Sequence, residues 1–549
     1  MSKLKIGFIV DNSEFDPYSL SLFQEIDADP IHFAPPAILS QTINESNPKN
    51  FLFAIKFLFS INAFSLPQKM IKRIALFLLS LVESEPLNEK RFSARDLNQE
   101  IHDLKPAISK SGFVYRYELE EIQKIQDLKL DLLIRCGSGI LRGDILTCTP
   151  MGVLSFHHGD NRFYRGGPPG FWEVFLEQPS TGFIVQQLTE TLDAGNIIAR
   201  GNFMTAHNWE SNYTFLRKKS NFFLLKLLKN ISITKKLPLF EKDVLYLKEI
   251  FKAPSGLQLI HYLLKIYAPI KNSYFSYKRV MRWSVSFSPN AGLDLQFSKG
   301  VTITNPSGRF LADPFVIKHE NKNICFVEDY CYRENKGKIS AFELNQDSYQ
   351  SLGIVLEEDF HLSFPFVFKA DNELFMIPES SQNNDIRLYR AKNFPYKWEL
   401  VNIIMKNISA ADTMVCELEG TWFLFTNICS AGMNDHQSEL HIFYSDDLRE
   451  GAWNAVKCNP VIFDSNKARN AGLFFINNKL YRVNQVHGQN HYGKSFQVNE
   501  VLELNKEIYL EKTILSVKPD FLKNLTSTHH LHMNDDFTVY DHARMEKVV

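Results

Sequence analysis

The chain has 549 residues, a formal net charge of −1, 44% apolar residues and 22% charged residues. Because single hydrophobic cores stop growing near roughly 250 to 300 residues, this length predicts two or three domains. With this balanced charge no strong field attracts polyanions, so no nucleic acid is expected as a partner. The seven cysteines include no Cys-x-x-Cys pair. This argues against a disulfide scaffold and a structural zinc site, and it favours a reducing, cytoplasmic location.

Residues 1–205 alternate short apolar runs with turn-like or helix-like segments, which is the pattern of an α/β sheet. The runs are Ile6–Val10, Leu132–Cys136, Val153–Phe156 and Gly182–Leu188. A helical insertion is predicted over about residues 50–127, and a helical linker over residues 206–282. Residues 51–82 are the most membrane-like stretch, but charged residues and Pro67 interrupt it well before about 20 apolar residues. We therefore expect packed helices and no membrane span, with a helix lying in a membrane interface as the alternative.

The composition changes at Trp283, after which aromatic and β-branched residues alternate with turns and predict an all-β domain. Similar four-residue segments recur roughly 50 to 60 residues apart, a spacing typical of one four-stranded blade per repeat. The segments begin at Asp313, Phe364, Asp412, Ala471 and Thr528. We predict a five-bladed β-propeller over residues 283–549. Trp283–Phe287 is expected to pair with the strands around Phe537–Asp541, because a propeller must hide the free edges of its first and last blades.

The strongest chemical signal is Ser155-Phe156-His157-His158-Gly159, which leads into Arg165-Gly166 and is followed by Asp193-Ala194-Gly195. These residues resemble the formyltransferase family, which includes methionyl-tRNA, glycinamide ribonucleotide and sugar-nucleotide N-formyltransferases. In that family an Asn-x-His strand end leads into an Arg-Gly turn, and a later Asp-x-Gly supplies the third catalytic residue. The resemblance implies an α/β Rossmann-like formyltransferase domain over residues 1–205, with 10-formyltetrahydrofolate as the formyl donor.

The chemistry explains these residue types. An amine that attacks a formyl carbon must lose a proton while negative charge builds on the carbonyl oxygen, so the site needs a base and a positioned donor. The resemblance assigns both needs to His157, with Asp193 orienting its imidazole. Ser155 stands where the family has asparagine, and His158, where the family usually has proline, is a candidate for the missing donor. The same substitution is compatible with an altered or inactive site.

Two further groups of residues are predicted to bind ligands in this domain. Asp160 and Arg162 have no counterpart in the family and are either substrate-binding or surface residues, and Arg165 of the Arg-Gly turn is assigned to the substrate. In the family, the backbone of a segment at a strand end binds the pterin of the folate. Two glycines would let that backbone approach a flat ring, although an ordinary strand-to-helix turn is the alternative. The matching segment here is Arg135-Cys136-Gly137-Ser138-Gly139-Ile140.

Residues Trp283–Asp541 resemble the five-bladed propeller at the amino terminus of plant glucosamine inositolphosphorylceramide transferases, itself reminiscent of glycoside hydrolase propellers. The matching features include Ala312-Asp313-Pro314-Phe315, Pro378-Glu379-Ser380-Ser381 and Ala468-Arg469-Asn470-Ala471-Gly472. The resemblance implies that Asp313 and Asp412 face the central channel. Acid catalysis of hydrolysis needs a third carboxylate, none is found near Arg469, and Glu379 belongs to the second blade. Glycan binding by Asp313, Glu379, Asp412 and Arg469 is therefore favoured over hydrolysis.

The segment His529-His530-x-His532 resembles a metal cluster, but alternation along a strand puts His530 and His532 on one face and His529 on the other. No metal site is expected. The leading hypothesis is a cytoplasmic N-formyltransferase that acts on an amino group of a sugar or sugar nucleotide and carries a glycan-binding propeller. The alternatives are a non-catalytic glycan-binding protein with a decayed formyltransferase site, and a propeller glycosidase or glycosyltransferase.

Overall fold

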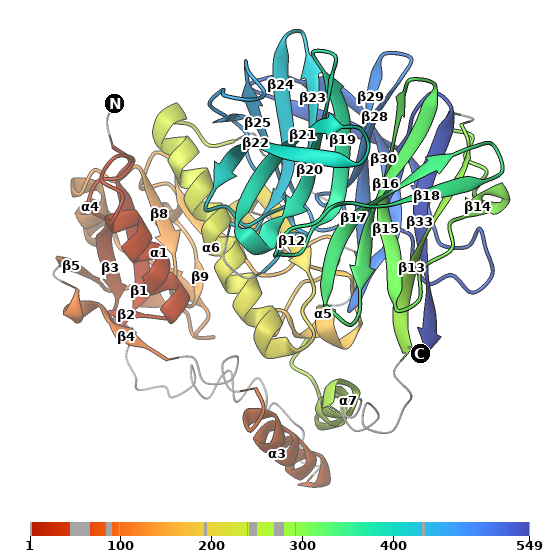
Figure 1. Cartoon of the computed structure of the whole chain (residues 1–549). Helices are drawn as coiled ribbons and strands as arrows, with labels where there is room; N and C mark the ends of the chain where they lie inside the picture. The colour runs from red at the N-terminus through yellow and green to blue at the C-terminus, as the bar shows by residue number, and fades with distance from the viewer. Residues whose placement is uncertain are drawn as a thin grey trace. The chain divides into compact units, whose positions relative to one another are not determined.

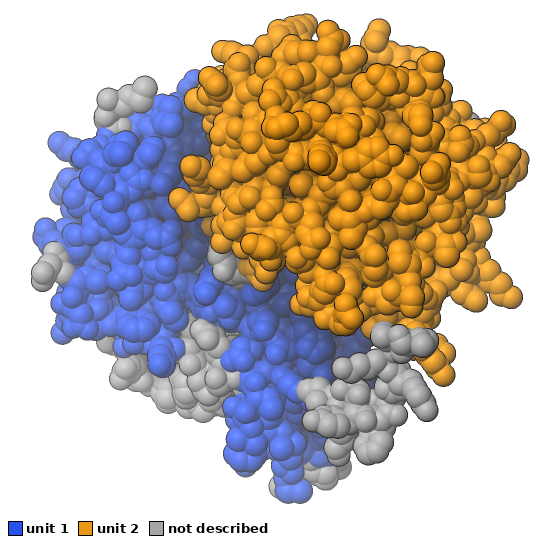
Figure 2. Space-filling model, viewed as in Figure 1, with its two compact units in different colours: residues 1–271 blue, residues 272–549 orange. Residues whose placement is uncertain are grey.

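The structure is a computed structural model that describes residues 3–43, 66–83, 90–97, 99–190, 195–238, 240, 250–267, 279–290, 292–430 and 434–547. It divides into two compact units, unit 1 over residues 1–271 and unit 2 over residues 272–549 (Figures 1 and 2). No helix among the described residues is long and apolar enough to cross a membrane.

Unit 1 contains a nine-stranded mixed sheet in the order β12-β11-β10-β8-β1-β2-β4, with β3 paired to β1 and β5 to β3. Its strands are β1 Ile6–Asp11, β2 Glu14–Phe15, β3 Ala37–Gln41, β4 Phe92–Ser93, β5 Ile101–Leu104, β8 Leu132–Arg135, β10 Val153–His157, β11 Ser180–Gln187 and β12 Asn196–Met204. A small second sheet holds β6 Ala107–Ile108, β7 Val114–Arg116 and β9 Ile140–Leu141. The helices are α1 Pro17–Asp27, α3 Leu66–Ser80, α4 Leu119–Asp127, α5 Phe171–Phe175, α6 Trp209–Thr234 and α7 Gly256–Tyr267.

The parallel centre of the sheet runs β5-β3-β1-β8-β10, and β11 and β12 extend it with antiparallel pairing. Successive strands of the chain add on one side of β1 and then on the other, so the strand order reverses between β1 and β8. In open α/β sheets ligands bind outside the carboxyl ends of the strands at such a switch point. At this edge the predicted folate segment follows β8, and His157 is the last residue of β10.

Alternation along β1 explains the two layers of this unit. Phe8 and Val10 pack in a core with Leu224 of α6, whereas Ile9 packs in a second core with Ile122 of α4. Successive side chains of a strand point to opposite faces, so β1 is apolar on both. Figure 1 shows α1 and α6 beside this sheet.

Two predictions about the helical segments are wrong in part. The insertion predicted as helical over residues 50–127 contains strands β4 to β7 between residues 92 and 116, and β5 joins the main sheet through Ile38↔Ile101. Strands of two to four residues are too short to produce a periodic pattern. Residues 44–65 lie outside the described residues. In the predicted linker, α6 buries Leu228 and Ile231 in the core of unit 1, so it belongs to that unit.

Unit 2 is a five-bladed propeller, as predicted. Each blade is an antiparallel sheet, and the inner strands β15, β19, β23, β28 and β32 neighbour one another in a ring that returns from β32 to β15. The first three blades contain β15 Arg309–His319, β16 Lys322–Cys331, β17 Lys336–Leu344, β18 Tyr349–Leu356, β19 Ser363–Ala370, β20 Glu373–Ser380, β21 Asp385–Asn393, β22 Lys397–Lys406, β23 Ala410–Leu418, β24 Thr421–Ile428, β25 Glu439–Ser445, β26 Asn454–Ala455 and β27 Ile462–Phe463. The last two contain β28 Asn470–Ile476, β29 Lys479–Gly488, β30 His491–Leu504, β31 Tyr509–Val517, β32 Leu531–Met533, β33 Phe537–Lys547, β13 Arg279–Pro289 and β14 Val301–Thr302.

The fifth blade closes the ring with strands from both ends of the unit. β13 pairs antiparallel with β33 from Arg279↔Lys547 to Pro289↔Phe537. This confirms the predicted pairing of Trp283–Phe287 with the carboxy-terminal strand, although β13 begins at Arg279, before Trp283. The free edges of the propeller are thereby hidden.

Candidate functional site

His157 is the last residue of β10 and is half-buried. Its Nε2 lies 3.3 Å from the carbonyl oxygen of Tyr164. The chain returns to the imidazole because the amides of Phe163 and Tyr164 donate to the carbonyl oxygen of Asp160, at 2.9 and 2.8 Å. The predicted catalytic histidine and the beginning of the Arg-Gly turn are therefore neighbours.

The Arg-Gly turn is held by the segment that precedes α7. The amide of Phe251 donates to the carbonyl of Arg165 at 2.8 Å, and the amide of Gly167 donates to the carbonyl of Phe251 at 3.1 Å. Gly166 has φ +101°, and a Cβ at this position would lie 2.1 Å from the carbonyl oxygen of Phe251. Trp172 adds a bond from Nε1 to the carbonyl of Lys252 at 3.1 Å. Only glycine fits at the centre of this turn.

Asp160 is buried, so the surface interpretation does not hold for it. Its carboxylate accepts from Arg162 Nη2 and from Arg200 Nη1, each at 2.5 Å, and Arg200 also donates to Asn161 Oδ1 at 3.0 Å. A Cβ on Gly182 would lie 2.8 Å from the Cβ of Asp160. Asp160 therefore ties the loop after β10 to β11 and β12, with Arg162 as a partly exposed partner.

Ser155 and His158 were the candidates for the position of the family asparagine, and each contacts a neighbouring group. The Ser155 hydroxyl is buried and donates to the carbonyl of Phe156 at 3.3 Å. His158 Nε2 lies 3.4 Å from Ser220 Oγ on α6, and its ring stacks on Phe156. Burial, and then Arg217 and His157, lower the pKa of His158 well below its ordinary value, so its imidazole is neutral at pH 7. Asp193 lies outside the described residues.

Glu173 is a carboxyl that the sequence interpretation missed. It lies on α5 and is 3% exposed, and burial raises its pKa to about 7, with Asp160 adding to the effect. Carboxyls with a pKa near the working pH are candidates for acid–base catalysis. The signal in the sequence was one acidic residue inside the aromatic run Phe171–Phe175.

The predicted folate segment follows β8 at the switch point of the sheet. Residues 137–140 are half-buried, so their backbone is partly accessible. The amide of Ser138 donates to both carboxylate oxygens of Asp11, at 3.1 and 2.9 Å. A Cβ on Gly137 would lie 2.5 Å from Asp11 Oδ1 and from Gln41 Nε2, and Gly139 has φ +80°. The glycines let the segment pack on the ends of β1 and β3, and they leave its backbone partly exposed.

The other members of this segment are structural. The Arg135 guanidinium donates to the carbonyl of Gly139 and closes the loop on itself. Burial raises the pKa of the Cys136 thiol to about 12, which makes it an unreactive thiol at neutral pH. Residues 137–140 are the partly accessible part of the segment. The side chains of Arg135 and Cys136 support the loop.

In unit 2, three of the four predicted glycan-binding residues meet at Arg469. The Arg469 guanidinium donates through Nε and Nη2 to the two carboxylate oxygens of Asp412, and Nη2 lies 3.5 Å from Glu379 Oε2. Gln485 Nε2 adds a bond to Asp412 at 3.2 Å. Arg469 and Asp412 are both buried. This is a desolvated bidentate pair of the kind that fixes side-chain geometry.

The recurring sequence segments coincide with a backbone irregularity in the inner strands. Asp313, Phe364 and Asp412 have φ of +50°, +46° and +49°, and the pairing register shifts at each of them. Left-handed backbone costs roughly 1–2 kcal/mol for a residue with a Cβ. Strained bulges of this kind re-aim side chains and gather at functional sites. In β15, β19 and β23 the repeated segment therefore marks the bulge at which the strand changes the direction of a side chain.

Glu328 on β16 supplies a further carboxyl that the sequence interpretation missed. It is buried, and its Oε1 lies 3.6 Å from His361 Nε2. Burial raises its pKa well above the ordinary value, and Asp313, Glu379 and Asp412 add to the effect. A third carboxyl was expected near Arg469 in the fourth blade and was not found there, whereas Glu328 comes from β16 of the first blade. It was missed because the blades bring together acids from separate repeats, which sequence distance conceals.

Asp313 belongs to a neighbouring group with Asp541 and His529. His529 Nδ1 lies 2.7 Å from Asp541 Oδ2, and His529 Nε2 lies 3.4 Å from Asp313 Oδ1. One ligand atom of each residue lies within 4.8 Å of the others, a spacing compatible with a metal ion. His529 also stacks on Trp283 with ring centroids 4.0 Å apart. Although burial opposes a charged imidazole, Asp541 and then Asp313 raise the pKa of His529.

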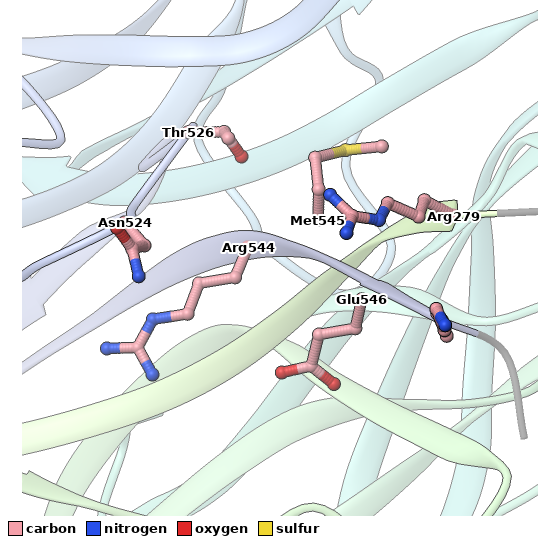
Figure 3. A pocket seen from close by; sticks show the side chains of 7 residues that line it. Arg279, Asn524, Thr526, Arg544, Met545 and Glu546 are labelled. Atoms are coloured by element: carbon pink, nitrogen blue, oxygen red, sulfur yellow. The ribbon is translucent and has the colours of Figure 1, made fainter.

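A hollow of about 510 Å³ lies elsewhere in unit 2, along β13 and β33. Figure 3 shows its lining side chains, which include Arg279, Arg544 and Glu546. None of the predicted site residues lines it.

Comparisons with known proteins find similarity for each half of the chain. Residues 276–533 match the family described as glucosamine inositolphosphorylceramide transferase 1, N-terminal. The rice protein of that name (Oryza sativa subsp. japonica) is 36% identical over 208 residues, which are 37% of this chain and 27% of the rice protein. A methionyl-tRNA formyltransferase of Wolbachia sp. subsp. Drosophila simulans is 24% identical over 220 residues, 38% of this chain and 72% of that protein.

Among solved structures, the catalytic domain of the Coprinopsis cinerea GH62 α-L-arabinofuranosidase resembles this chain. The match covers 48% of this chain and 97% of the arabinofuranosidase chain. Its sequence identity is 10% and its TM-score is 0.33. The propeller architecture rests on the strand pairing described above. The chain joins an amino-terminal formyltransferase-like domain to a carboxy-terminal propeller of the kind found in the N-terminal region of glucosamine inositolphosphorylceramide transferase 1.

Proposed function

We propose that unit 1 transfers a formyl group from 10-formyltetrahydrofolate to an amino group of a sugar or sugar nucleotide, and that the propeller binds the glycan part. The observation that supports this most is the position of His157 at the carboxyl end of β10, next in the sheet to β8 and its folate segment. The amino-sugar acceptor rests on the similarity of the propeller to a protein named for glucosamine transfer.

In this proposal, residues 137–140 hold the folate through their backbone, and the bound cofactor supplies the formyl carbon. His157 removes the proton from the amine as it attacks the formyl carbon, and the protonated imidazole then stabilises the charge on the carbonyl oxygen. It returns the proton to the folate nitrogen as the bond from that nitrogen to the formyl carbon breaks. Asp193 orients the imidazole, and Arg165 of the turn binds the acceptor. Glu173, with its pKa near 7, is a second group able to exchange a proton at neutral pH.

The test is single-turnover transfer from 10-formyltetrahydrofolate to a panel of amino sugars and nucleotide-linked amino sugars, with the product detected by mass spectrometry. His157→Asn should lower the rate about 100 to 10,000-fold, the usual effect of losing a general base. His102→Asn is the matched control, because His102 is a half-buried histidine on β5 beside Glu100. A wild-type chain that neither binds folate nor formylates any acceptor would instead support a non-catalytic glycan-binding protein.

Glu328 favours a second candidate function, hydrolysis or transfer of a glycan by the propeller. Burial raises the pKa of Glu328, and a carboxyl with a raised pKa among other carboxyls is the kind of group that general acid catalysis of glycoside cleavage requires. Chromogenic aryl glycosides of common pentoses and hexoses test this directly. Turnover that Glu328→Gln abolishes would support the second candidate, and no turnover would leave glycan binding as the role of the propeller.

A further inference from the structure

The centre of the propeller gathers carboxyl groups from four blades. Burial and then the charges of four other acids raise the pKa of Glu328, so the five carboxyls act on one another as one group. We call this group the acid cluster, and its members are Asp313, Glu328, Glu379, Asp412 and Asp541. Carboxylates buried this close together repel one another, so the group is stable only in the company of positive charge.

The basic side chains of the propeller supply only part of that charge. Arg469 is shared by two acids, since it binds both carboxylate oxygens of Asp412 and its Nη2 lies 3.5 Å from Glu379 Oε2. His529 Nδ1 lies 2.7 Å from Asp541 Oδ2. Among the described residues, no lysine and no further arginine forms an ion pair with the acid cluster. The cluster therefore has room for a cation that the chain itself does not supply.

Asp313 carries the open acceptor of the cluster. Its Oδ1 is buried and accepts no hydrogen bond from a described residue, although His529 Nε2 lies 3.4 Å away. His530 Nδ1 lies 3.6 Å from the same oxygen, and neither ring nitrogen of this fully buried imidazole has a hydrogen-bond partner. Gln485, whose amide donates to Asp412, has a buried Oε1 that is also unpartnered. Proteins leave few buried polar atoms in this state, so these atoms indicate a ligand that donates hydrogen bonds.

An exposed aromatic ring lies beside these acceptors. Tyr492 is 37% exposed and stacks on His487 with ring centroids 5.2 Å apart. Its ring also meets the His529 ring edge to face at 5.3 Å. A Cβ on the next residue, Gly493, would lie 2.8 Å from the Cβ of His529, so this segment packs tightly on that histidine. The rings of aromatic side chains attract organic cations, so Tyr492 adds a second feature that suits a positively charged ligand.

The cluster therefore combines excess negative charge, free acceptors and an aromatic ring. A protonated primary amine carries one positive charge and three hydrogen-bond donors, so it matches all three. A hydroxyl donates but carries no charge, and an acylated amine has lost its charge and all but one donor. We propose that the acid cluster binds the protonated amino group of an unacylated amino sugar, with the ammonium on Asp313 and the sugar against Tyr492.

The acceptor of the formyl group follows from this, in a step that rests on the proposed function. An ammonium group held by carboxylates has no lone pair, so it cannot be the nitrogen that attacks the formyl carbon. The amine formylated by unit 1 must then be a different one. The acceptor is therefore an oligosaccharide that contains more than one amino sugar, of which the propeller holds one while another reacts.

The test is calorimetric titration of the full chain, without folate and in the presence of EDTA, with glucosamine, N-acetylglucosamine, glucose and the β-1,4-linked glucosamine dimer. Glucosamine and its dimer should bind at least about tenfold more tightly than the two uncharged sugars, because only they make charge-assisted hydrogen bonds. Asp313→Asn should remove this preference and leave the affinity for glucose unchanged. Asparagine tolerates the left-handed backbone at this position, φ +50°, so the variant should fold.

Two further variants accompany Asp313→Asn. Asp536→Asn is the matched control, because Asp536 is a partly exposed acid of the same unit that pairs with Lys318 and lies outside the acid cluster. It should leave the preference for glucosamine intact. Tyr492→Ala changes an exposed residue and no buried charge, and it should weaken glucosamine binding about two- to fivefold through the lost contact of cation and ring.

Three outcomes would overturn the proposal. One is equal affinity for glucosamine and N-acetylglucosamine. Another is a preference for glucosamine that survives both Asp313→Asn and Tyr492→Ala, which would place the amine elsewhere. The last is binding of Ca²⁺ or Mn²⁺, in a titration without EDTA, that excludes glucosamine and requires Asp313, which would make a metal ion the occupant. Preference for the free amine without any formyl transfer would refute the proposed function and leave this site in place.

Discussion

Gly166→Ala separates backbone strain from steric displacement at the candidate active site. The Cβ of alanine would lie 2.1 Å from the carbonyl oxygen of Phe251, whereas real Cβ contacts do not fall below 3.0 Å. The Arg-Gly turn or the segment before α7 must therefore move by about 1 Å. Misplacing a catalytic group by about 1 Å can cost on the order of 100-fold in rate. The left-handed backbone adds roughly 1–2 kcal/mol of destabilisation.

Gly112→Ala is the matched control for this variant. Gly112 has φ +78°, and a Cβ added there would have no neighbouring atom within 4 Å. Alanine at this position therefore strains the left-handed backbone but pushes no neighbouring atom away. Both variants should lower the melting temperature, and only Gly166→Ala should lower kcat/KM for formyl transfer about 100-fold. Thermal unfolding and single-turnover kinetics measure the two effects. Equal kinetics for the two variants would refute the argument that the turn must hold its position beside His157.

Three further predictions concern buried charges. The pKa of Glu328 is raised in the native state above its ordinary value of 4.5. As the pH rises above 4.5, the unfolded chain releases this proton while the native state keeps it. The free energy of unfolding therefore falls with rising pH in this range. Glu328→Gln should therefore raise the melting temperature more at pH 8 than at pH 5, and an equal gain at both would contradict this. Arg482→Met should cost about 3–5 kcal/mol in urea unfolding, because it leaves the largely buried carboxylate of Glu511 without its bidentate partner, and Arg482→Lys should not restore that geometry. A loss under about 1 kcal/mol would show that Glu511 finds other partners. Glu83→Gln should cost about 1–3 kcal/mol in thermal unfolding, because its amide would face the amide of Glu210; unchanged stability would mean that the side chain can turn.

The propeller could be predicted from the sequence because its signal is long and repeated. The segments that begin at Asp313, Phe364 and Asp412 each sit at a strained bulge, and five such repeats leave few other architectures. His157 could be singled out because it ends an apolar run and stands with Arg165-Gly166 and Asp193-Ala194-Gly195 in the order of the formyltransferase family. Both signals are local and survive without knowledge of the tertiary contacts.

What the sequence could not predict depends on distance across the fold. Strands β4 to β7 are so short that their pairing partners, and not their own pattern, decide their structure. Glu328 and Glu379 belong to different blades, and only the ring of blades brings them to the same group of acids. Glu173 is hidden in an aromatic helix, and its unusual pKa comes from burial that no sequence pattern reports.

The pairing of β13 with β33 also has a consequence for how this propeller can be combined with other domains. Because Arg279 lies opposite Lys547, the chain enters and leaves the ring at the same end and on adjacent strands. A propeller built in this way can be inserted between two other domains, or appended after one, without a crossover and without opening a blade. A domain joined after Lys547 would therefore leave the propeller next to β13, the strand by which the chain enters it.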